Sequence, residues 1–233
     1  MALGEGMRVT VVGATGLVGR ELLRLLQVRR FPVAGDPVLV ASPASEGRRL
    51  PWMDREVRVR ALSAEVFDGV DVALFSAGGP RSREFAPVAV EAGAVVVDNS
   101  SAWRSDPDVP LVVAEVNPQA IARRPKRIVA NPNCTTMVLM VAAGPLHAAF
   151  GLVEMTVATY QSVGGEGRAA IGELVGQARK LVADADRLRR DGAAVESQVV
   201  GEHFSRTVAF NVLAHCGDFQ GDHYTVEEHK GSR

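Results

Sequence analysis

A glycine pattern near the N-terminus limits the fold more than any other feature of this chain: Gly13-Ala-Thr-Gly16-Leu-Val-Gly19. The β-branched run from Arg8 to Val12 predicts a strand before it, and apolar residues at helical spacing from Leu17 to Val28 predict a helix after it. In this context Gly13 permits a tight turn, Gly16 lets backbone N–H groups approach a pyrophosphate, and Gly19 allows close packing of helix on strand. The pattern predicts a nucleotide-binding loop, and a plain glycine turn is the alternative.

Strands and helices continue to alternate along the chain, which predicts an α/β fold with a parallel sheet. We expect further strands at 38–41, 70–76, 94–98 and 128–130, and helices at 82–92 and 134–150, the last kinked or interrupted by Pro145. The pattern then changes, with a longer strand expected at 155–163 and an amphipathic helix at 167–190. We place a domain boundary between residues 133 and 134.

Composition excludes several functional classes. With a net charge of -1, the 233-residue chain has no basic field for nucleic acid or an anionic membrane. No apolar run reaches the roughly 18 residues that span a bilayer, and residues 1–6 do not resemble a signal peptide. The only cysteines are Cys134 and Cys216, which suits a reducing cytoplasm rather than a disulfide framework. No metal site is expected.

The end of the second predicted strand bears on the choice of dinucleotide. An NAD site usually carries an acidic residue there, to hold the ribose 2′-hydroxyl. Here the strand ends at Ala41-Ser42, and Ser45, Arg48 and Arg49 follow. Hydroxyl and guanidinium groups suit a 2′-phosphate, which favours NADP. Merely solvated arginines are the alternative, and Glu46 is a nearby acid that weakens the case.

A second motif, Asn131-Pro-Asn133-Cys134-Thr135-Thr136, lies between a predicted strand and a predicted helix. The helix dipole and the unpaired N–H groups at a helix N-terminus favour the thiolate form of cysteine, which is the nucleophilic form. Cys134 is therefore a candidate covalent catalyst. The alternative is a small buried hydrophobic residue. Cys216 lacks this context and is expected to be structural or incidental.

Several motifs occur in order and carry a family resemblance: Gly13–Gly19, Asp98-Asn-Ser-Ser-Ala-Trp-Arg104, Val109–Asn117, the Cys134 motif, Thr159-Tyr-Gln161, Ala209-Phe-Asn-Val and Tyr224-Thr-Val-Glu-Glu-His-Lys230. Together they resemble the bacterial type of aspartate-semialdehyde dehydrogenase, over essentially all of residues 7–230. The resemblance implies a Rossmann-like NADP-binding domain over residues 1–133. A catalytic and dimerisation domain of α+β type, incomplete at its C-terminus, is implied over residues 134–233.

The implied activity is the NADPH-dependent reductive dephosphorylation of L-aspartyl 4-phosphate to L-aspartate 4-semialdehyde, through a thioester on the cysteine. The pathway implied is lysine, threonine, methionine and diaminopimelate biosynthesis, in a cytoplasmic homo-oligomer that binds only small molecules. The resemblance also assigns residues. Cofactor binding is implied for Gly13, Thr15, Gly16, Leu17, Val18, Ser42, Ser45, Gly164 and Gly165. Catalysis is implied for Cys134 and Gln161, and substrate or phosphate binding for Arg104, Asn133, Gln161, Glu227 and Lys230.

Three departures from the family pattern keep alternatives open. Ala44 stands where the family usually has arginine, which leaves Arg48 or Arg49 to contact the 2′-phosphate. Gly164-Gly-Glu166-Gly replaces the usual Ser-Gly-Ala-Gly, and an inward Glu166 would repel cofactor phosphate. The chain also ends at Arg233, before the arginine and the general acid/base histidine expected from the resemblance. The alternatives are a catalytically dead NADP-binding or interaction paralogue, and a non-functional fragment.

Overall fold

The computed structural model describes residues 6–193 and 201–231 and begins with the predicted strand–loop–helix unit. Strand β1 (Val9–Val12) is buried throughout, and helix α1 (Leu17–Val28) follows the glycine loop. The chain forms two compact units, the first extending to Thr156 and the second beginning at Val157. The domain boundary expected between residues 133 and 134 stays a prediction.

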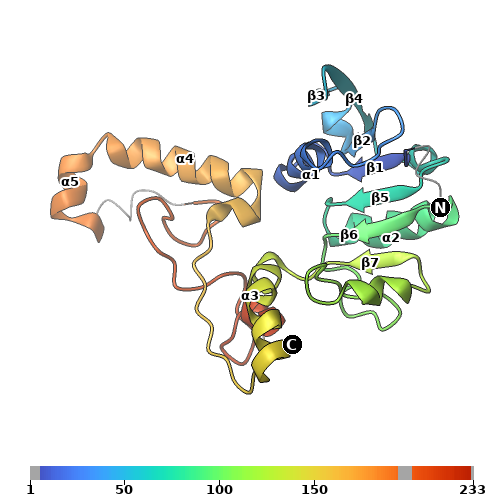
Figure 1. Ribbon diagram of the computed structural model, residues 1–233. Helices are drawn as coiled ribbons and strands as arrows, with labels where there is room; N and C mark the ends of the chain where they lie inside the picture. The colour runs from blue at the N-terminus through green and yellow to red at the C-terminus, as the bar shows by residue number, and fades with distance from the viewer. Residues whose placement is uncertain (1–5, 194–200, 232–233) are drawn as a thin grey trace. The chain divides into compact units, whose positions relative to one another are not determined.

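In the described residues, seven strands form one sheet in the order β3-β4-β2-β1-β5-β6-β7 (Figure 1). The parallel strands are β1, β2 (Val38–Ala41), β4 (Arg55–Ala61), β5 (Val72–Phe75), β6 (Val95–Asp98) and β7 (Ile128–Ala130). Strand β3 (Arg49–Trp52) runs antiparallel to β4 at one edge. The predicted Rossmann-like α/β fold is confirmed. Sequence analysis missed β3 and β4, although charged residues alternate with valine in Arg55–Ala61.

Helices cover both faces of this sheet, because successive side chains of each strand point to opposite faces. Val9 and Val11 of β1 lie in one apolar cluster with residues of α1, and Val12 lies in a second cluster with residues of α2 (Gly79–Glu91). Burying one such valine contributes about 1.5–3 kcal/mol, so the two clusters fix α1 and α2 on opposite sides. The glycine loop is thereby held between two packed layers.

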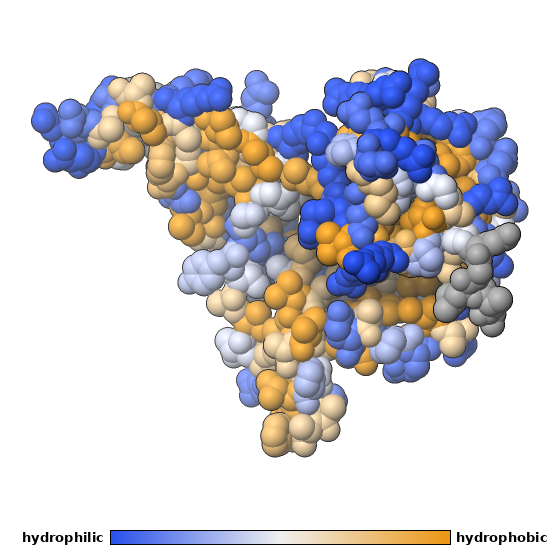
Figure 2. All heavy atoms as spheres, turned by 45° about the horizontal axis from the view of Figure 1, so that its top comes forward, coloured by the Kyte–Doolittle hydropathy of each residue, from blue (hydrophilic) through white to orange (hydrophobic). Residues whose placement is uncertain are grey.

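Helix α3 (Cys134–Phe150) has the predicted bounds, and of its described residues only Ala143 is buried. Pro145 lies inside it, and the helix continues through that residue. Most of its large apolar side chains are exposed, including Val138 and Phe150, which are 76% and 84% exposed. Figure 2 shows hydrophobic surface along this helix. The first compact unit therefore presents an apolar helix at its surface.

The strand expected at Met155–Val163 is wrong. Residues 151–162 have no regular secondary structure, and Val153 and Tyr160 are 98% and 93% exposed. Valine, threonine and tyrosine favour strands only where a neighbouring strand accepts and donates the backbone hydrogen bonds. No described strand or bridge pairs with this segment, so its composition alone does not produce β-structure.

The second compact unit is built mainly on α4 (Arg168–Val182). The single helix expected at residues 167–190 ends at Val182, and α5 (Ala185–Arg190) follows a break at residues 183 and 184. A 3₁₀ turn, η4 (Val163–Glu166), precedes α4, and α7 (Val226–Gly231) lies near the C-terminus. The buried apolar cluster here is small and centres on Leu181 and Ala209.

Besides this small cluster, hydrogen bonds to two polar side chains of α4 hold the loop that begins at Gly201. The Glu173 carboxylate accepts hydrogen bonds from the backbone N–H groups of residues 202, 203 and 204. Gln177, which is 4% exposed, accepts two more through Oε1, from residues 208 and 209. A Cβ on Gly201 would lie 2.0 Å from Glu173 Oε1, so a side chain at the start of this loop would displace the Glu173 carboxylate.

Among the described residues, no helix has both the length and the apolar character needed to cross a lipid bilayer.

Candidate active site

The carboxyl ends of the parallel strands bring the predicted residues of the first unit to one edge of the sheet. The glycine loop follows β1, and Ser42 and Ser45 follow β2. Asp98 ends β6, and the Cys134 motif follows β7. Strand β1 lies between β2 and β5, so the connections on its two sides diverge there. Such a switch point opens the crevice in which α/β sheets bind ligands.

The glycine loop lies too close to its neighbours for side chains at two positions. Gly13 has a φ of +89°, and a Cβ on it would lie 2.2 Å from the Ser76 carbonyl oxygen after β5. A Cβ on Gly19 would lie 2.2 Å from the Gly13 carbonyl oxygen. Both approaches involve backbone atoms, which cannot rotate aside. The close packing of α1 expected from the glycine spacing is therefore present.

The start of α1 has the chemistry of a phosphate site. Gly16 is the N-cap and supplies no capping side chain, and Gly16, Leu17 and Val18 are exposed. The first N–H groups of a helix have no acceptor within the helix and carry partial positive charge. These groups fit the pyrophosphate of a dinucleotide. Residues 13 to 18 could hold NADP in this way.

Hydroxyl groups connect this loop to the one after β2. Thr15 Oγ1 lies 3.5 Å from Oγ of Ser45, which is buried, while Ser42 is half-buried. Arg48 and Arg49 are exposed immediately beyond. The structure adds Arg58 of β4 to the arginines near this loop: its Nη2 lies 3.9 Å from the position that a Cβ on Gly47 would take. Sequence analysis missed Arg58 because it missed its strand.

Sequence analysis also left Gly78 and Gly79 unassigned. They follow β5 at the same edge of the sheet, and Gly78 has a φ of +85° at the N-cap of α2. A Cβ on Gly79 would lie 3.8 Å from the Ser101 hydroxyl. Glycines shortly after an apolar strand and before a helix are a signal similar to the one that identified Gly13, so the sequence contained the information.

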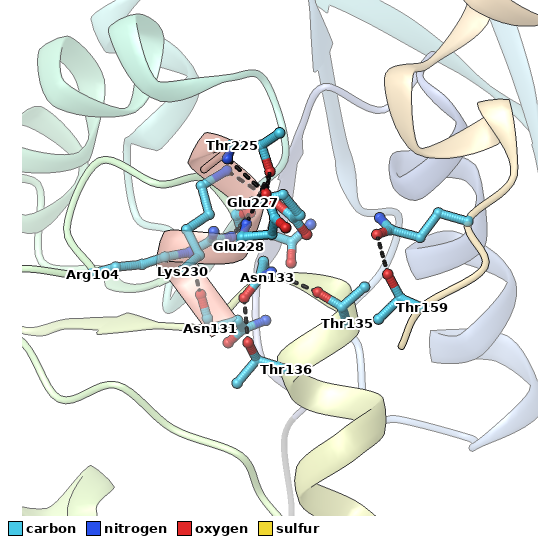
Figure 3. A network of polar contacts seen from close by, with 12 residues as sticks. Arg104, Asn131, Asn133, Thr135, Thr136, Thr159, Thr225, Glu227, Glu228 and Lys230 are labelled. Atoms are coloured by element: carbon cyan, nitrogen blue, oxygen red, sulfur yellow. Dashed lines mark hydrogen bonds and ion pairs between the residues drawn. The ribbon is translucent and has the colours of Figure 1, made fainter. Parts of the chain in front are cut away.

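Arg104 is held by two backbone carbonyl groups. Its Nε donates to the Asn131 carbonyl oxygen at 2.7 Å (Figure 3). Its Nη2 donates to the Asn99 carbonyl oxygen at 3.1 Å. The residue is half-buried. A guanidinium is planar, so two such bonds fix both its position and its orientation. Arg104 thus lies beside the turn that leads to Cys134.

Cys134 is the first residue of α3, and it is exposed. The preceding Asn133 is the N-cap and is 8% exposed. Its Nδ2 donates to Thr135 Oγ1 at 2.7 Å, and its Oδ1 accepts from Thr136 Oγ1 (Figure 3). An exposed thiol at a helix N-terminus is accessible to substrate. Its exposure argues against the alternative interpretation of Cys134 as a small buried hydrophobic residue. Cys216 is half-buried.

The other predicted residues belong to the second unit. Gln161 lies in the irregular segment, where its Oε1 accepts from Thr159 Oγ1 at 3.1 Å. Gly164 and Gly165 lie in η4. In that turn Glu166 lies 3.8 Å from His203 Nε2.

Helix α7 carries Glu227 and Lys230, which form an ion pair at 3.3 Å (Figure 3). A capping box begins this helix: the Glu228 carboxylate accepts from the Thr225 backbone N–H at 2.7 Å, and Thr225 Oγ1 accepts from the Glu228 N–H at 3.2 Å. The hydrogen bond from the Thr225 N–H, followed by that from its hydroxyl, lowers the pKa of Glu228 below its ordinary value. The box therefore fixes the start of the turn that carries both candidate residues.

Within residues 6–193 and 201–231, no group of three or more His, Cys, Asp or Glu side chains is arranged to hold a metal ion.

Known proteins match both parts of the chain. Residues 8–124 match the family model of the semialdehyde dehydrogenase NAD-binding domain, and residues 144–233 match that of the semialdehyde dehydrogenase dimerisation domain. An aspartate-semialdehyde dehydrogenase from Streptomyces akiyoshiensis is 49% identical over 226 residues, which are 96% of this chain and 65% of that protein. One from Vibrio mimicus is 42% identical, over 98% of this chain and 68% of that protein. The chain belongs to the aspartate-semialdehyde dehydrogenase family.

A solved structure agrees with this membership. Aspartate-semialdehyde dehydrogenase II from Vibrio cholerae, complexed with ASA, has a TM-score of 0.88 and 42% identity, covering 98% of this chain and 64% of that one. The chain spans 64–68% of the length of these three family members. The family resemblance inferred from the motifs is confirmed, whereas the roles of individual residues stay predictions.

Replacing Gly19 by alanine should weaken NADP binding and destabilise the first unit. The added methyl group would lie 2.2 Å from the Gly13 carbonyl oxygen, so α1 must move off the loop. We expect a loss of about 1–3 kcal/mol, which is typical of overpacking, in urea unfolding of the first unit followed by the fluorescence of its two tryptophans, Trp52 and Trp103. Gly176→Ala in α4 is the matched control, because nothing lies within 4 Å of its Cβ position. Equal NADP affinity and stability in both variants would contradict this account of the loop.

The capping box should weaken as the pH falls. The pKa of Glu228 is lowered in the folded chain, so the carboxylate's contribution is present above its ordinary value of 4.5 and is lost as the pH falls through the lower folded value. The Thr225 amide resonance in NMR should titrate in that acidic range. Glu228→Gln should abolish the titration, because an amide does not ionise there. An unchanged titration in this variant would assign the effect to another group, such as Asp222.

Proposed function

We propose that this chain has the dehydrogenase activity of its family: reductive dephosphorylation of L-aspartyl 4-phosphate to L-aspartate 4-semialdehyde. The observation that carries the proposal is Cys134, an exposed thiol at the first position of α3, which follows a turn whose Asn131 carbonyl accepts from the Arg104 guanidinium. This arrangement combines a nucleophile with a phosphate-binding cation at one edge of the sheet. The phosphate role of Arg104 is part of the proposal.

The Cys134 thiolate would attack the acyl carbon of the substrate. A bond forms between sulfur and carbon, the bond from carbon to the phosphate oxygen breaks, and phosphate leaves. A thiolate suits this step because it is a strong nucleophile and later a good leaving group. Arg104 would bind the departing phosphate through charge-assisted hydrogen bonds.

NADPH, bound at the glycine loop, would supply the hydride that reduces the thioester carbon. The residues proposed to hold it are Gly13, Thr15, Gly16, Leu17 and Val18, with Ser42 and Ser45 toward the ribose. Gly164 and Gly165 are also proposed to bind the cofactor. After reduction, the carbon–sulfur bond breaks, the aldehyde leaves, and Cys134 regains its thiolate.

Four further residues are proposed to position the substrate. Asn133 would orient the phosphate or acyl group next to the nucleophile, because its side chain is buried and hydrogen-bonded at the N-cap. Gln161 would orient the acyl group for attack. Glu227 would bind the substrate ammonium, and Lys230 would contact phosphate. Their opposite charges match these two ligand groups.

We also propose that the chain is a cytoplasmic homo-oligomer that acts on small molecules in amino-acid biosynthesis. The match to a dimerisation domain and the exposed apolar residues of α3 support self-association. The two free cysteines suit a reducing compartment.

Turnover should depend on Cys134. With aspartate semialdehyde, phosphate and NADP, the protein should produce NADPH absorbance. Cys134→Ala should reduce the rate on the order of 10³-fold or more, as expected when a covalent nucleophile is lost. Cys216→Ala is the matched control and should retain the rate. NADP binding with no Cys134-dependent turnover would reduce the proposal to nucleotide binding.

Sedimentation equilibrium should give a mass of at least twice that of one chain at micromolar concentration. Burial of the exposed apolar side chains of α3 against a second copy would drive this association. A single species at the mass of one chain across the concentration range would contradict the proposed homo-oligomer.

A further inference from the structure

Asp98 is a buried acidic residue to which the proposed reaction gives no role. It ends β6 at the carboxyl edge of the sheet, and none of its surface is exposed. Its Oδ2 accepts a hydrogen bond from Ser100 Oγ at 2.6 Å. Among the described side chains, its Oδ1 is the buried oxygen for which no hydrogen-bond partner exists. A buried carboxylate with one unpaired oxygen is costly, so its presence at this position calls for a physical reason.

Ser100 links this carboxylate to the backbone of the following loop. While its hydroxyl donates to Asp98, its oxygen accepts from the Ala102 backbone N–H at 3.1 Å. Ser100 is itself 9% exposed. The two bonds fold residues 98 to 102 into a compact turn that is anchored to the end of a core strand.

Hydrogen bonds hold the segment from this turn to Arg104 against its neighbours. The Asn99 N–H donates to the Phe75 carbonyl oxygen of β5, and Trp103 Nε1 donates to Ser82 Oγ of α2. Arg104 then donates to the carbonyl oxygens of Asn99 and Asn131. The Asn99 carbonyl lies inside the turn that Ser100 closes, so its direction depends on that turn.

We propose that Asp98 and Ser100 act as a positioning pair that holds the Arg104 guanidinium in place beside the Cys134 turn. The pair does not touch the substrate; it fixes the carbonyl group of Asn99 to which Arg104 donates. The backbone carbonyl of Asp98 also accepts a hydrogen bond from the Asn131 N–H. Asp98 therefore connects to the sheet both residues, Asn99 and Asn131, whose carbonyl groups bind Arg104. This inference rests on the proposed function only in that the proposed function assigns phosphate binding to Arg104.

The reactivity of Arg104 toward phenylglyoxal, measured by peptide mass spectrometry, tests the pair without turnover. Ser100→Ala should raise the modification rate of Arg104 about fivefold, the change that corresponds to losing one net hydrogen bond that keeps the side chain in place. Inorganic phosphate should protect Arg104 in the unaltered protein and protect it less in the variant. The NADP dissociation constant should stay within about twofold, because the glycine loop on β1 is unaffected.

Two further variants separate positioning from general stability. Asp98→Asn should leave the Arg104 modification rate near that of the unaltered protein, because an amide oxygen can still accept from the Ser100 hydroxyl. Its stability should fall, because an amide NH2 then occupies the buried position of Oδ1. Asp108→Asn, an exposed carboxylate on the same segment, is the control for removing one charge. A faster reaction at Arg104 in Ser100→Ala that is absent in Asp98→Asn fits a geometric role.

The outcomes distinguish this inference from the proposed function. An unchanged Arg104 modification rate in folded Ser100→Ala would overturn the positioning pair. An equal loss of NADP binding and of phosphate protection in that variant would also overturn it, since this would show general unfolding. Absence of phosphate protection in the unaltered protein, together with a faster reaction in Ser100→Ala, would contradict the phosphate role of Arg104 and leave the positioning pair supported.

Discussion

The arrangement of the first unit depends on backbone atoms that meet where only glycine can stand. Gly13 passes against the Ser76 carbonyl, and Gly19 packs against the carbonyl of Gly13. These two contacts set how far β1, β5 and α1 lie from one another. The open start of α1 and the loop after β5 owe their relative positions to this spacing. A side chain at either position would separate the elements that form the proposed cofactor site.

The sequence predicted the parts of the fold whose signals are local. The bounds of α1, β2, β7 and α3 follow from glycine punctuation and apolar periodicity over a few residues. The strand predicted at Met155–Val163 is absent because strand formation depends on a partner strand elsewhere in the chain, which local composition does not report. Strand β4 was missed although its alternation of charged residues with valine is local.

The candidate site divides in a similar way. Cys134 and the glycine loop could be identified from the sequence because their chemistry depends on a helix N-terminus, which short motifs mark well. The contacts that orient Arg104 could not be identified, because they come from carbonyl groups 5 and 27 residues away. Asp98 lay inside a motif that the sequence analysis quoted, yet nothing in the sequence shows that one of its oxygens is buried without a partner. Such facts arise only from tertiary packing.

The polar attachment of the loop after Gly201 has a consequence for the dynamics of the second unit. Five backbone amides of that loop donate to just two side chains of α4, Glu173 and Gln177. Their hydrogen exchange therefore reports the opening of α4 as much as the motion of the loop, and the two segments behave as one cooperative unit. Because the attachment is made of hydrogen bonds rather than apolar contact, cooling weakens it less than it weakens a hydrophobic core.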